Sequence, residues 1–455
     1  MVLEARLDRW ALQLVVAVVV AWVLNGLPFH LRRIGVLDAA VYQQEVARIC
    51  PASIQPFWLP VLCHKYPLST QDSTRLHIVS VARFYQLGDA EILLKLFKYG
   101  VMVALLMFSI MVIVRHRKFR PRWRSLLPWL PLQISMGVAL VIGLLKGSAL
   151  AATSGLVGIL WVPLVPLAGW LLTPRRQQLL CDGLAVMILL HLPIQILESM
   201  RALPLSRLDQ PYGLPLPGRI VGLVTMPNTL GVVMMLMLVF CLSFSGRHWH
   251  HRFLGAAVLP QLLLARSGTG LFALALLLGM PSLGRLLRAG AFHRRVAGLL
   301  LAAGGSLALL LSFPLLLGRP GMMDSLTGRA DVMLASLHSA SWPELVFGRG
   351  LGSGGVLARR LQETLTSHSW LSANLSMPEG LNSTDSLWIL LLVQGGLLAI
   401  AAFLGLMLFC IWRDRKARPF LVLMLLCSLT LNLTEVFPLG LLLAVVVRRS
   451  LSFAA

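Results

Sequence analysis

Acidic residues are scarce in this sequence. Its 455 residues include 18 Asp and Glu side chains against 40 Lys and Arg, and only 13% of all residues are charged. So little charge cannot supply the polar surface of a soluble fold, particularly since 57% of the residues are hydrophobic. A single large soluble domain is therefore excluded, and a lipid bilayer is the natural environment for this chain.

The sequence also lacks several patterns that would identify particular chemistry. No His, Cys, Asp and Glu residues show metal-ligand spacing, and no phosphate-binding loop of the Walker type is present. We therefore expect a site without metal or cofactor and do not expect ATP-driven transport. No low-complexity linker or fixed-period repeat divides the chain, which predicts one polytopic membrane domain over residues 1–455.

Apolar segments that approach the thickness of a bilayer follow one another along the chain. They lie at 10–29, 98–114, 126–145, 149–172, 179–197, 220–244, 253–265, 269–283, 296–317, 387–411, 419–433 and 436–447. The pattern predicts an all-α integral membrane protein of about twelve transmembrane helices. The segments within 253–283 and 419–447 are short for a span, which favours broken or re-entrant helices there.

The net charge of +22 is clustered between the apolar segments. The basic clusters lie at 115–124, 175–176, 247–252, 285–295, 413–418 and 448–449. The positive-inside rule makes these segments cytoplasmic, with both termini on the same side. No basic segment is interleaved with aromatic residues on a plausible soluble surface, so nucleic-acid binding is not expected.

The same topology places the three longest loops outside. They run over about 30–95, 198–219 and 318–386, the last lying between the ninth and tenth helices. The first apolar segment is expected to be a retained anchor, because residues 25–33 offer no small-residue cleavage site of a signal peptide.

Four of the six cysteines lie in apolar segments and are expected to be small core residues. These are Cys181, Cys241, Cys410 and Cys427. The other two, Cys50 and Cys63, share the first exterior loop, where a disulfide and two free thiols both remain open.

One candidate site residue is Arg219, at the exterior end of an apolar segment that also contains Pro227 and Asn228. Proline in a span removes a backbone hydrogen bond and lets neighbouring groups face a cavity. The alternative is an arginine that snorkels to the interface beside a kink that serves packing.

A second candidate is Arg266, in the turn 265–270 with Ser267 and Thr269. An exterior arginine departs from the positive-inside trend, and the two glycines of this turn let the backbone approach a phosphate closely. Guanidinium groups bind pyrophosphate bidentately and stay charged at physiological pH. A simple solvated turn is the structural alternative.

The large exterior loop contributes further candidates: Arg329, Arg349 and His368. Its glycine run at 348–355 matches part of a dinucleotide fingerprint, but no βαβ unit surrounds it, which favours a tight loop. Residues 357–366 could form an amphipathic helix on this loop.

A polar cluster at 382–386 precedes the apolar segment that begins at Leu387. Thr, Asp and Ser are typical of a helix N-cap. Asp385 could also orient or deprotonate an acceptor hydroxyl, and the two roles are compatible.

Four patterns occur in order along the chain. They are R..G....PN.LG at 219–231, ARSGTG at 265–270, TGR with W.ELVFGRGLGSG in the large loop, and TDSLW with GGLL at 384–398. Their order and spacing resemble the O-antigen ligase and O-antigen polymerase superfamily of bacterial polysaccharide assembly. The resemblance implies a multi-pass glycosyltransferase of the bacterial inner membrane that acts at its outer face on undecaprenyl-pyrophosphate-linked oligosaccharide.

The resemblance also implies roles for individual residues. Arg219 and Arg266 would grip the pyrophosphate, and Asp385 would complete the catalytic set. The expected substrate-binding residues are Asn228, Ser267, Thr269, Arg329, Arg349 and His368. Chain-length regulator and export proteins are possible partners besides the bilayer and the lipid-linked substrate.

This chain departs from the ligases of this superfamily at one place in the fourth pattern. Ligases tend to carry a His-Asn pair before the span that follows the large loop, where this chain has Thr384 and Asp385. The difference favours polymerisation of repeat units into surface polysaccharide or exopolysaccharide. A ligase that transfers the glycan to an acceptor, a flippase or transporter of the lipid-linked oligosaccharide, and a non-catalytic scaffold are the alternatives.

Overall fold

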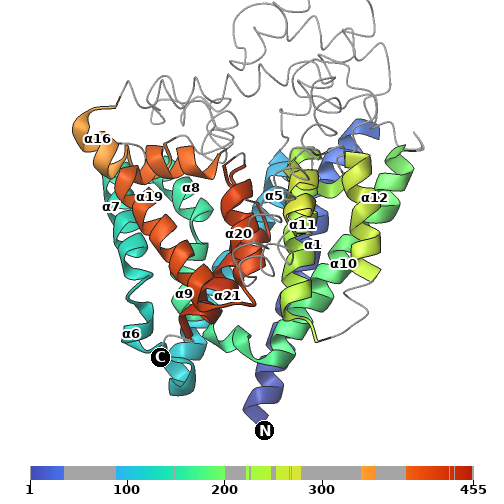
Figure 1. Cartoon of the computed structure of the whole chain (residues 1–455), viewed down its shortest axis with the longest axis horizontal. Coiled ribbons are helices and arrows are strands. Elements are labelled where there is room, and N and C mark those ends of the chain that lie inside the picture. The colour runs from blue at the N-terminus through green and yellow to red at the C-terminus, as the bar shows by residue number, and fades with distance from the viewer. Residues whose placement is uncertain are drawn as a thin grey trace, which may run out of the picture.

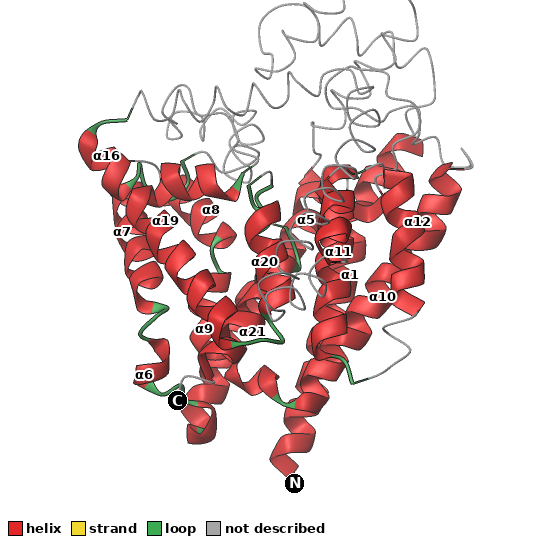
Figure 2. Cartoon of the chain, in the orientation of Figure 1, coloured by secondary structure: helices red, strands yellow, loops and turns green. Residues whose placement is uncertain are grey.

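The structure of the chain is a computed structural model in which part of the sequence is described. The described residues are 2–34, 89–146, 149–199, 222–224, 227–246, 253–265, 267, 269–277, 340–353, 386–429, 431–434 and 436–452. Within these ranges the chain forms helices joined by turns, and no strand occurs (Figure 2). The all-α prediction is confirmed for this part of the chain.

The described helices follow the predicted apolar segments. The α-helices are α1 (Val2–Ile34), α5 (Asp89–Arg115), α6 (Trp123–Leu126), α7 (Leu130–Lys146), α8 (Ala149–Gly158), α9 (Trp161–Leu167), α10 (Pro174–Ser199), α11 (Pro227–Phe244), α12 (Gly255–Ala265), α16 (Trp342–Phe347), α19 (Leu387–Arg413), α20 (Arg418–Cys427) and α21 (Leu439–Ser452). Three 3-10 helices join them: η1 (Arg117–Phe119), η2 (Ala168–Leu172) and η4 (Gly222–Val224). A further helical stretch covers residues 269–277.

Four of the described helices are long and apolar enough to cross a membrane. These stretches are Glu4–Gly26, Phe97–Arg115, Pro174–Leu197 and Leu387–Arg413. A bent pair, Arg117–Leu126 with Leu130–Lys146, makes a fifth if it counts as one span. The other described helices are shorter, and the predicted span at 296–317 lies outside the described residues. The count of twelve spans therefore stays a prediction.

Several predicted spans are broken or bent. The segment predicted as 126–145 contains a bend of 90° between α6 and α7. The segment 149–172 is divided into α8, α9 and η2, and Pro166 lies inside α9. Hydropathy records only how apolar a segment is, so it could not reveal these changes of direction. The segment 220–244 begins as η4, and Pro227 is the first residue of α11, where a proline needs no backbone hydrogen bond.

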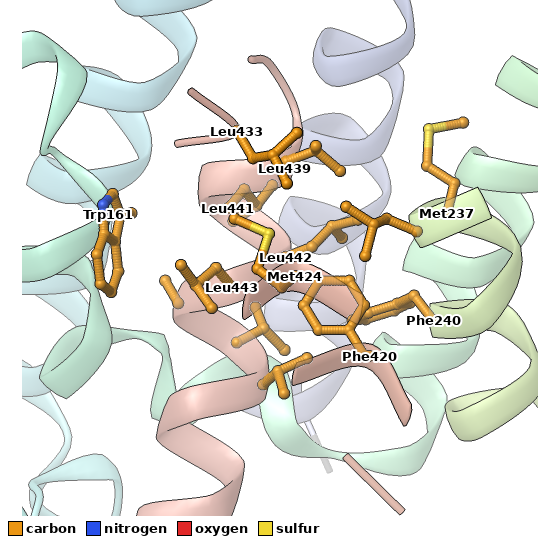
Figure 3. Packing of buried hydrophobic residues seen from close by; sticks show 14 of the residues in the cluster. Trp161, Met237, Phe240, Phe420, Met424, Leu433, Leu439, Leu441, Leu442 and Leu443 are labelled. Carbon is orange, nitrogen blue, oxygen red and sulfur yellow. The ribbon is translucent and has the colours of Figure 1, made fainter. Parts of the chain in front are cut away.

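The packing places two apolar helices at the centre of the bundle. Every residue of α11 from Leu230 to Cys241 is buried, and α21 is buried from Leu439 to Arg448. A helix that is hydrophobic all round is typical of a central position. Figure 3 shows the side chains of α20 and α21 packed against α11, where the rings of Phe240 and Phe420 lie 6.0 Å apart, centroid to centroid.

The surrounding helices turn apolar side chains outward. Large exposed hydrophobic residues occur on α1, α5, α7, α10 and α12, among them Val16, Met107, Val141, Val186 and Leu263. A soluble protein rarely exposes apolar faces on so many helices, whereas lipid-facing helices require them. The described part of the chain is thus a helical bundle suited to a membrane.

Both termini lie at the same end of this bundle, which we call the terminal end (Figure 1). At this end, the fully buried side chain of Arg176 donates through Nε to Asp8 Oδ1 at 2.9 Å and also pairs with Glu4. Arg449 donates through Nε to Asp414 Oδ2 at 3.1 Å. These contacts join the predicted basic clusters in two pairs, since Glu4 binds both Arg176 and Lys118, while Asp414 of the segment 413–418 binds Arg449.

The predicted exterior loops overlap some of the described elements. α1 continues to Ile34 and α5 begins at Asp89, so helix occupies both edges of the segment 30–95. α16 lies within the segment 318–386, at the end of the bundle opposite the termini (Figure 1). The possible helix at 357–366 lies outside the described residues.

The four cysteines predicted as core residues are all buried, which confirms that prediction. Cys50 and Cys63 lie outside the described residues.

Candidate functional site

The predicted site residues are described unequally. Five of them lie outside the described residues: Arg219, Arg266, Arg329, His368 and Asp385. Asn228 is the second residue of α11, described there as backbone alone. Ser267, Thr269 and Arg349 are described with their side chains. The structure therefore describes the site through the segments next to the candidate arginines in the sequence.

The first two sequence patterns meet through a pair of glycines. A Cβ atom added to Gly231 of α11 would lie 2.5 Å from Ser267 Oγ and 3.2 Å from Gly270 Cα. A Cβ added to Gly270 would lie 2.9 Å from Gly231 Cα. Only glycine permits this approach of two backbones. The glycines of R..G....PN.LG and ARSGTG thus pack α11 directly against the turn that follows α12.

Ser267 has a clear structural role in that turn. Its side chain is fully buried, and its Oγ accepts a hydrogen bond from the backbone N–H of Gly270 at 3.1 Å. The bond caps the start of the helical stretch 269–277. Thr269, the first residue of that stretch, is partly exposed. Of these two hydroxyl residues, Thr269 is the more accessible.

The third and fourth patterns also meet, at a break in α19. Gly396 has φ 68° and interrupts the helix, and the loop 348–353 docks beside it. The backbone N–H of Arg349 donates to Val393 O at 2.7 Å, and that of Gly350 donates to Gln394 O at 3.2 Å. A helix break frees carbonyl groups of the preceding turn. The loop thus supplies donors to two carbonyls next to the break.

Glycines on four segments make this docking possible. Cβ atoms added to Gly396 and Gly348 would lie 2.2 Å from Val346 O and 2.3 Å from Gln394 O. A Cβ on Gly143 of α7 would lie 2.5 Å from Leu351 O, and one on Gly155 of α8 would lie 2.2 Å from Gly352 N. The loop is therefore inserted between α7, α8 and α19.

The loop itself is tight, as the sequence predicts. Gly348, Gly350 and Gly352 all have positive φ, and Leu351 buries its side chain to 2% exposure. The backbone N–H of Leu351 donates to Ala139 O of α7 at 2.8 Å. A glycine at each alternate position provides the turns, and the leucine provides the anchor.

Arg349 lies beside a carboxylate. Its Nε is 3.7 Å from Glu344 Oε2, and Lys146 Nζ donates to Glu344 Oε1 at 3.3 Å. Glu344 also accepts the backbone N–H of Ser341 in a capping box at the start of α16. The Ser341 N–H, and then Lys146 and Arg349, hold the pKa of the Glu344 carboxyl below its usual value. An anionic substrate at Arg349 would compete with Glu344.

The start of α19 is anchored to the turn after α20. Ser386 occupies the N-cap position that the cluster 382–386 predicts, but its side chain makes no capping hydrogen bond. Its Oγ donates to Ser428 O at 3.3 Å instead of capping a helix N–H, and the backbone N–H of Leu387 donates to the same carbonyl at 3.1 Å. This contact fixes the residue that directly follows Asp385.

Two buried polar residues were missed in the sequence interpretation. His191 is fully buried in α10, and its Nε2 accepts the backbone N–H of Leu223 at 2.8 Å, while Trp22 Nε1 lies 3.3 Å from Nδ1. A neutral imidazole has one acceptor nitrogen, so only one of these contacts is a full hydrogen bond, and the shorter is to Leu223. Gln195, one turn further, is buried with neither amide atom bonded.

His191 holds η4, the turn that follows Arg219 in the sequence, through its hydrogen bond with the backbone N–H of Leu223. Gly222 has φ 52°, and a Cβ there would lie 2.4 Å from His191 Cδ2. A signal was present in the sequence, because His191 and Gln195 are one helical turn apart within the apolar segment 179–197, where polar residues are costly.

Among the described residues, no group of three or more His, Cys, Asp or Glu side chains could hold a metal ion. Comparison of the chain with protein-family models, curated proteins and solved structures gave no match in any of the three.

Proposed function

We propose that the chain polymerises undecaprenyl-pyrophosphate-linked oligosaccharide repeat units at the outer face of the bacterial inner membrane. The observation that carries the proposal is the ordered set of four sequence patterns over residues 219–398. Two glycine contacts support the proposal. The first two patterns meet where Gly231 contacts Gly270, and the last two meet where the loop 348–353 contacts Gly396.

In this proposal the arginines stabilise the leaving pyrophosphate. Arg219 precedes the η4 turn held by His191, and Arg266 lies between two residues, Ala265 and Ser267, that are fully buried. Short anchored segments of this kind suit groups that must be held in place, because catalysis by charge stabilisation depends on preorganisation. Asn228, Thr269, Arg329 and His368 would bind the saccharide or phosphate, and Ser267 would shape the turn around them.

Asp385 would orient or deprotonate the acceptor hydroxyl of the growing or incoming glycan. It directly precedes Ser386, which is bonded to the turn after α20. A carboxylate can act as a general base once it is held near the acceptor. Glycosyl transfer of this type needs charge stabilisation and a base.

The topology of the proposal places the terminal end in the cytoplasm. Both termini and the basic residues of α10, α20 and α21 share that end (Figure 1). The positive-inside rule then puts α16 and the start of α19 at the outer face, where the lipid-linked donor would arrive.

The test is the size distribution of lipid-linked saccharides in cells that express the wild type or Arg266→Ala, with the leaflet of the accumulated species determined. We expect Arg266→Ala to accumulate single repeat units on the outer leaflet. Arg415→Ala, an exposed arginine on the turn between α19 and α20, is the matched control and should give normal polymer.

The other outcomes separate the alternatives. Completed polymer retained on its lipid carrier would favour a ligase, and repeat units held on the inner leaflet would favour a flippase. Unchanged chain length and yield in Arg266→Ala, at normal protein level, would contradict the proposed site and leave a scaffold.

A further inference from the structure

A buried arginine at the terminal end has no counter-ion among the described residues. Arg448, in the last two turns of α21, is 7% exposed, and its Nε and Nη1 atoms are buried without a hydrogen-bond partner. The guanidinium group stays protonated at physiological pH, so it cannot relieve this burial by becoming neutral. A buried charge is unfavourable unless it is paired and hydrogen-bonded.

The described acidic residues nearby are already paired with other groups. Glu4 and Asp8 pair with Arg176, and they also pair with Lys118 and Arg175, respectively. Asp414 pairs with Arg449, the residue next to Arg448. Water could satisfy the two N–H groups, but it would leave the positive charge without a counter-charge.

The neighbouring turn places a glycine beside the guanidinium. Gly169 of η2 is partly exposed, and a Cβ there would lie 3.5 Å from both Nε and Nη2 of Arg448 and 3.3 Å from Phe119 O. α21 packs against η2, and Thr173, directly after η2, has a buried Oγ1 that also lacks a partner. Three unpaired polar atoms therefore flank one short turn, and the residue of this turn beside the guanidinium is a glycine.

We propose that Arg448 binds a phosphate group at the terminal end, supplied by a phospholipid headgroup or by free phosphate. The guanidinium presents its N–H groups as a fork that matches two phosphate oxygens. The basic segment 115–124 adjoins the same turn through Phe119 and raises the local concentration of anions. This site is at the opposite end of the bundle from the proposed glycosyltransferase site and does not depend on it.

The test is the thermal unfolding of delipidated protein in non-ionic detergent, with phosphatidylglycerol or inorganic phosphate added at constant ionic strength. We expect a saturating probe to raise the Tm of the wild type by about 3 °C or more, because a ligand that binds only the folded state stabilises it. Arg448→Gln should lose this rise. Arg415→Gln, which removes an exposed arginine, should keep it.

The two probes distinguish the source of the phosphate. A rise with phosphatidylglycerol alone assigns a lipid headgroup, and a rise with inorganic phosphate assigns free phosphate. No rise in the wild type with either probe, or an equal rise in Arg448→Gln, would overturn the proposal.

A second variant covers the case in which Arg448→Gln does not fold. Gly169→Ala keeps the charge and places a methyl group against the guanidinium at an ordinary contact distance. We expect this variant to fold and to show a reduced rise in Tm with the same probe. An undiminished rise would place the binding elsewhere and overturn the proposal.

Discussion

Arg175 and Arg176 are neighbours in the chain and both contact Asp8, yet their surroundings differ. Arg175 Nη1 is 3.1 Å from Asp8 Oδ2, and 78% of its side chain is exposed. The side chain of Arg176 is fully buried and binds Asp8, Glu4 and the carbonyl oxygen of Trp170. The same charge on adjacent residues is therefore solvated in one case and enclosed in the other.

This difference predicts unequal losses of stability. Arg176→Gln should destabilise the protein by about 1–3 kcal/mol, because it removes the buried guanidinium that donates to the Asp8 carboxylate and to the Trp170 carbonyl oxygen. Arg175→Gln should cost less than about 1 kcal/mol, since an exposed pair contributes little. Unfolding of both variants in detergent measures the difference, and equal losses would contradict the buried network.

At the scale of one element, α19 depends on its glycines to different degrees. Gly396 has positive φ and contacts the loop 348–353, whereas Gly405 lies further along the same helix with no atom within 4 Å of an added Cβ. One glycine is required by the docking of the loop, and the other only lowers the helix propensity.

Gly396→Ala should therefore destabilise the protein by at least about 2 kcal/mol, since alanine resists this backbone conformation and its Cβ would meet Val346 O. Gly405→Ala should lie within about 1 kcal/mol of the wild type and tend to stabilise it. Thermal unfolding and the yield of polymer test both variants. A harmless Gly396→Ala would show that the loop is not docked at the break.

The capping box of α16 predicts a dependence on pH. Because the pKa of Glu344 is lowered from 4.5, its contribution to stability is complete above that value and is lost as the pH falls through the lower, folded-state pKa. The wild type should lose more Tm than Glu344→Gln between neutral and acidic pH. The Lys146→Met variant should still lose most of the Tm that the wild type loses in acid, because the Ser341 N–H is the main cause of the lowered pKa of Glu344.

A loss of Tm in acid that is the same in the wild type and Glu344→Gln would assign the pH dependence to other carboxyl groups.

Comparison of the elements with the sequence shows what hydropathy can and cannot predict. The spans at 98–114 and 179–197 fall within α5 and α10, since a continuous apolar run is sufficient to identify a helix. The break at Gly396 could not be predicted, although Gly395 and Gly396 were part of a noted pattern, because its stability depends on the distant loop 348–353.

The candidate site shows the same division between local and distant information. The tight loop at 348–353 was predicted from its glycines, which act locally. The hydrogen bond between Leu223 and His191 joins segments that are distant in the chain, so the residue types alone did not assign it. The cap that Ser267 forms with the N–H of Gly270 is local, but the serine was interpreted as a substrate-binding residue. The roles of Arg219, Arg266 and Asp385 remain predictions.

The whole molecule is organised around a difference between its two ends. The terminal end combines the basic residues of α1, α10 and α21 with both termini, and α16 with its docked loop lies at the other end (Figure 1). α10 connects the two ends, since Arg176 lies beside the first turns of α1 and the helix continues for 26 residues.

Reporter fusions test this orientation. Green fluorescent protein fused after Ser452 should fluoresce, because it would remain in the cytoplasm. Alkaline phosphatase should be inactive at that position and active when fused after Ser199, at the end of α10. Active phosphatase after Ser452 would contradict the cytoplasmic location of the C-terminal end, and inactive phosphatase after Ser199 would contradict the odd number of crossings up to that residue.

The docking of loop 348–353 gives the chain a built-in order of assembly. Its partners Gly143 and Gly155 belong to helices made early in synthesis, so their surfaces stay uncovered until the loop emerges from the ribosome. In the proposed topology, the loop reaches them only after it has itself been translocated. A folding factor or lipid that protects α7 and α8 would therefore act between the synthesis of these helices and the insertion of α19.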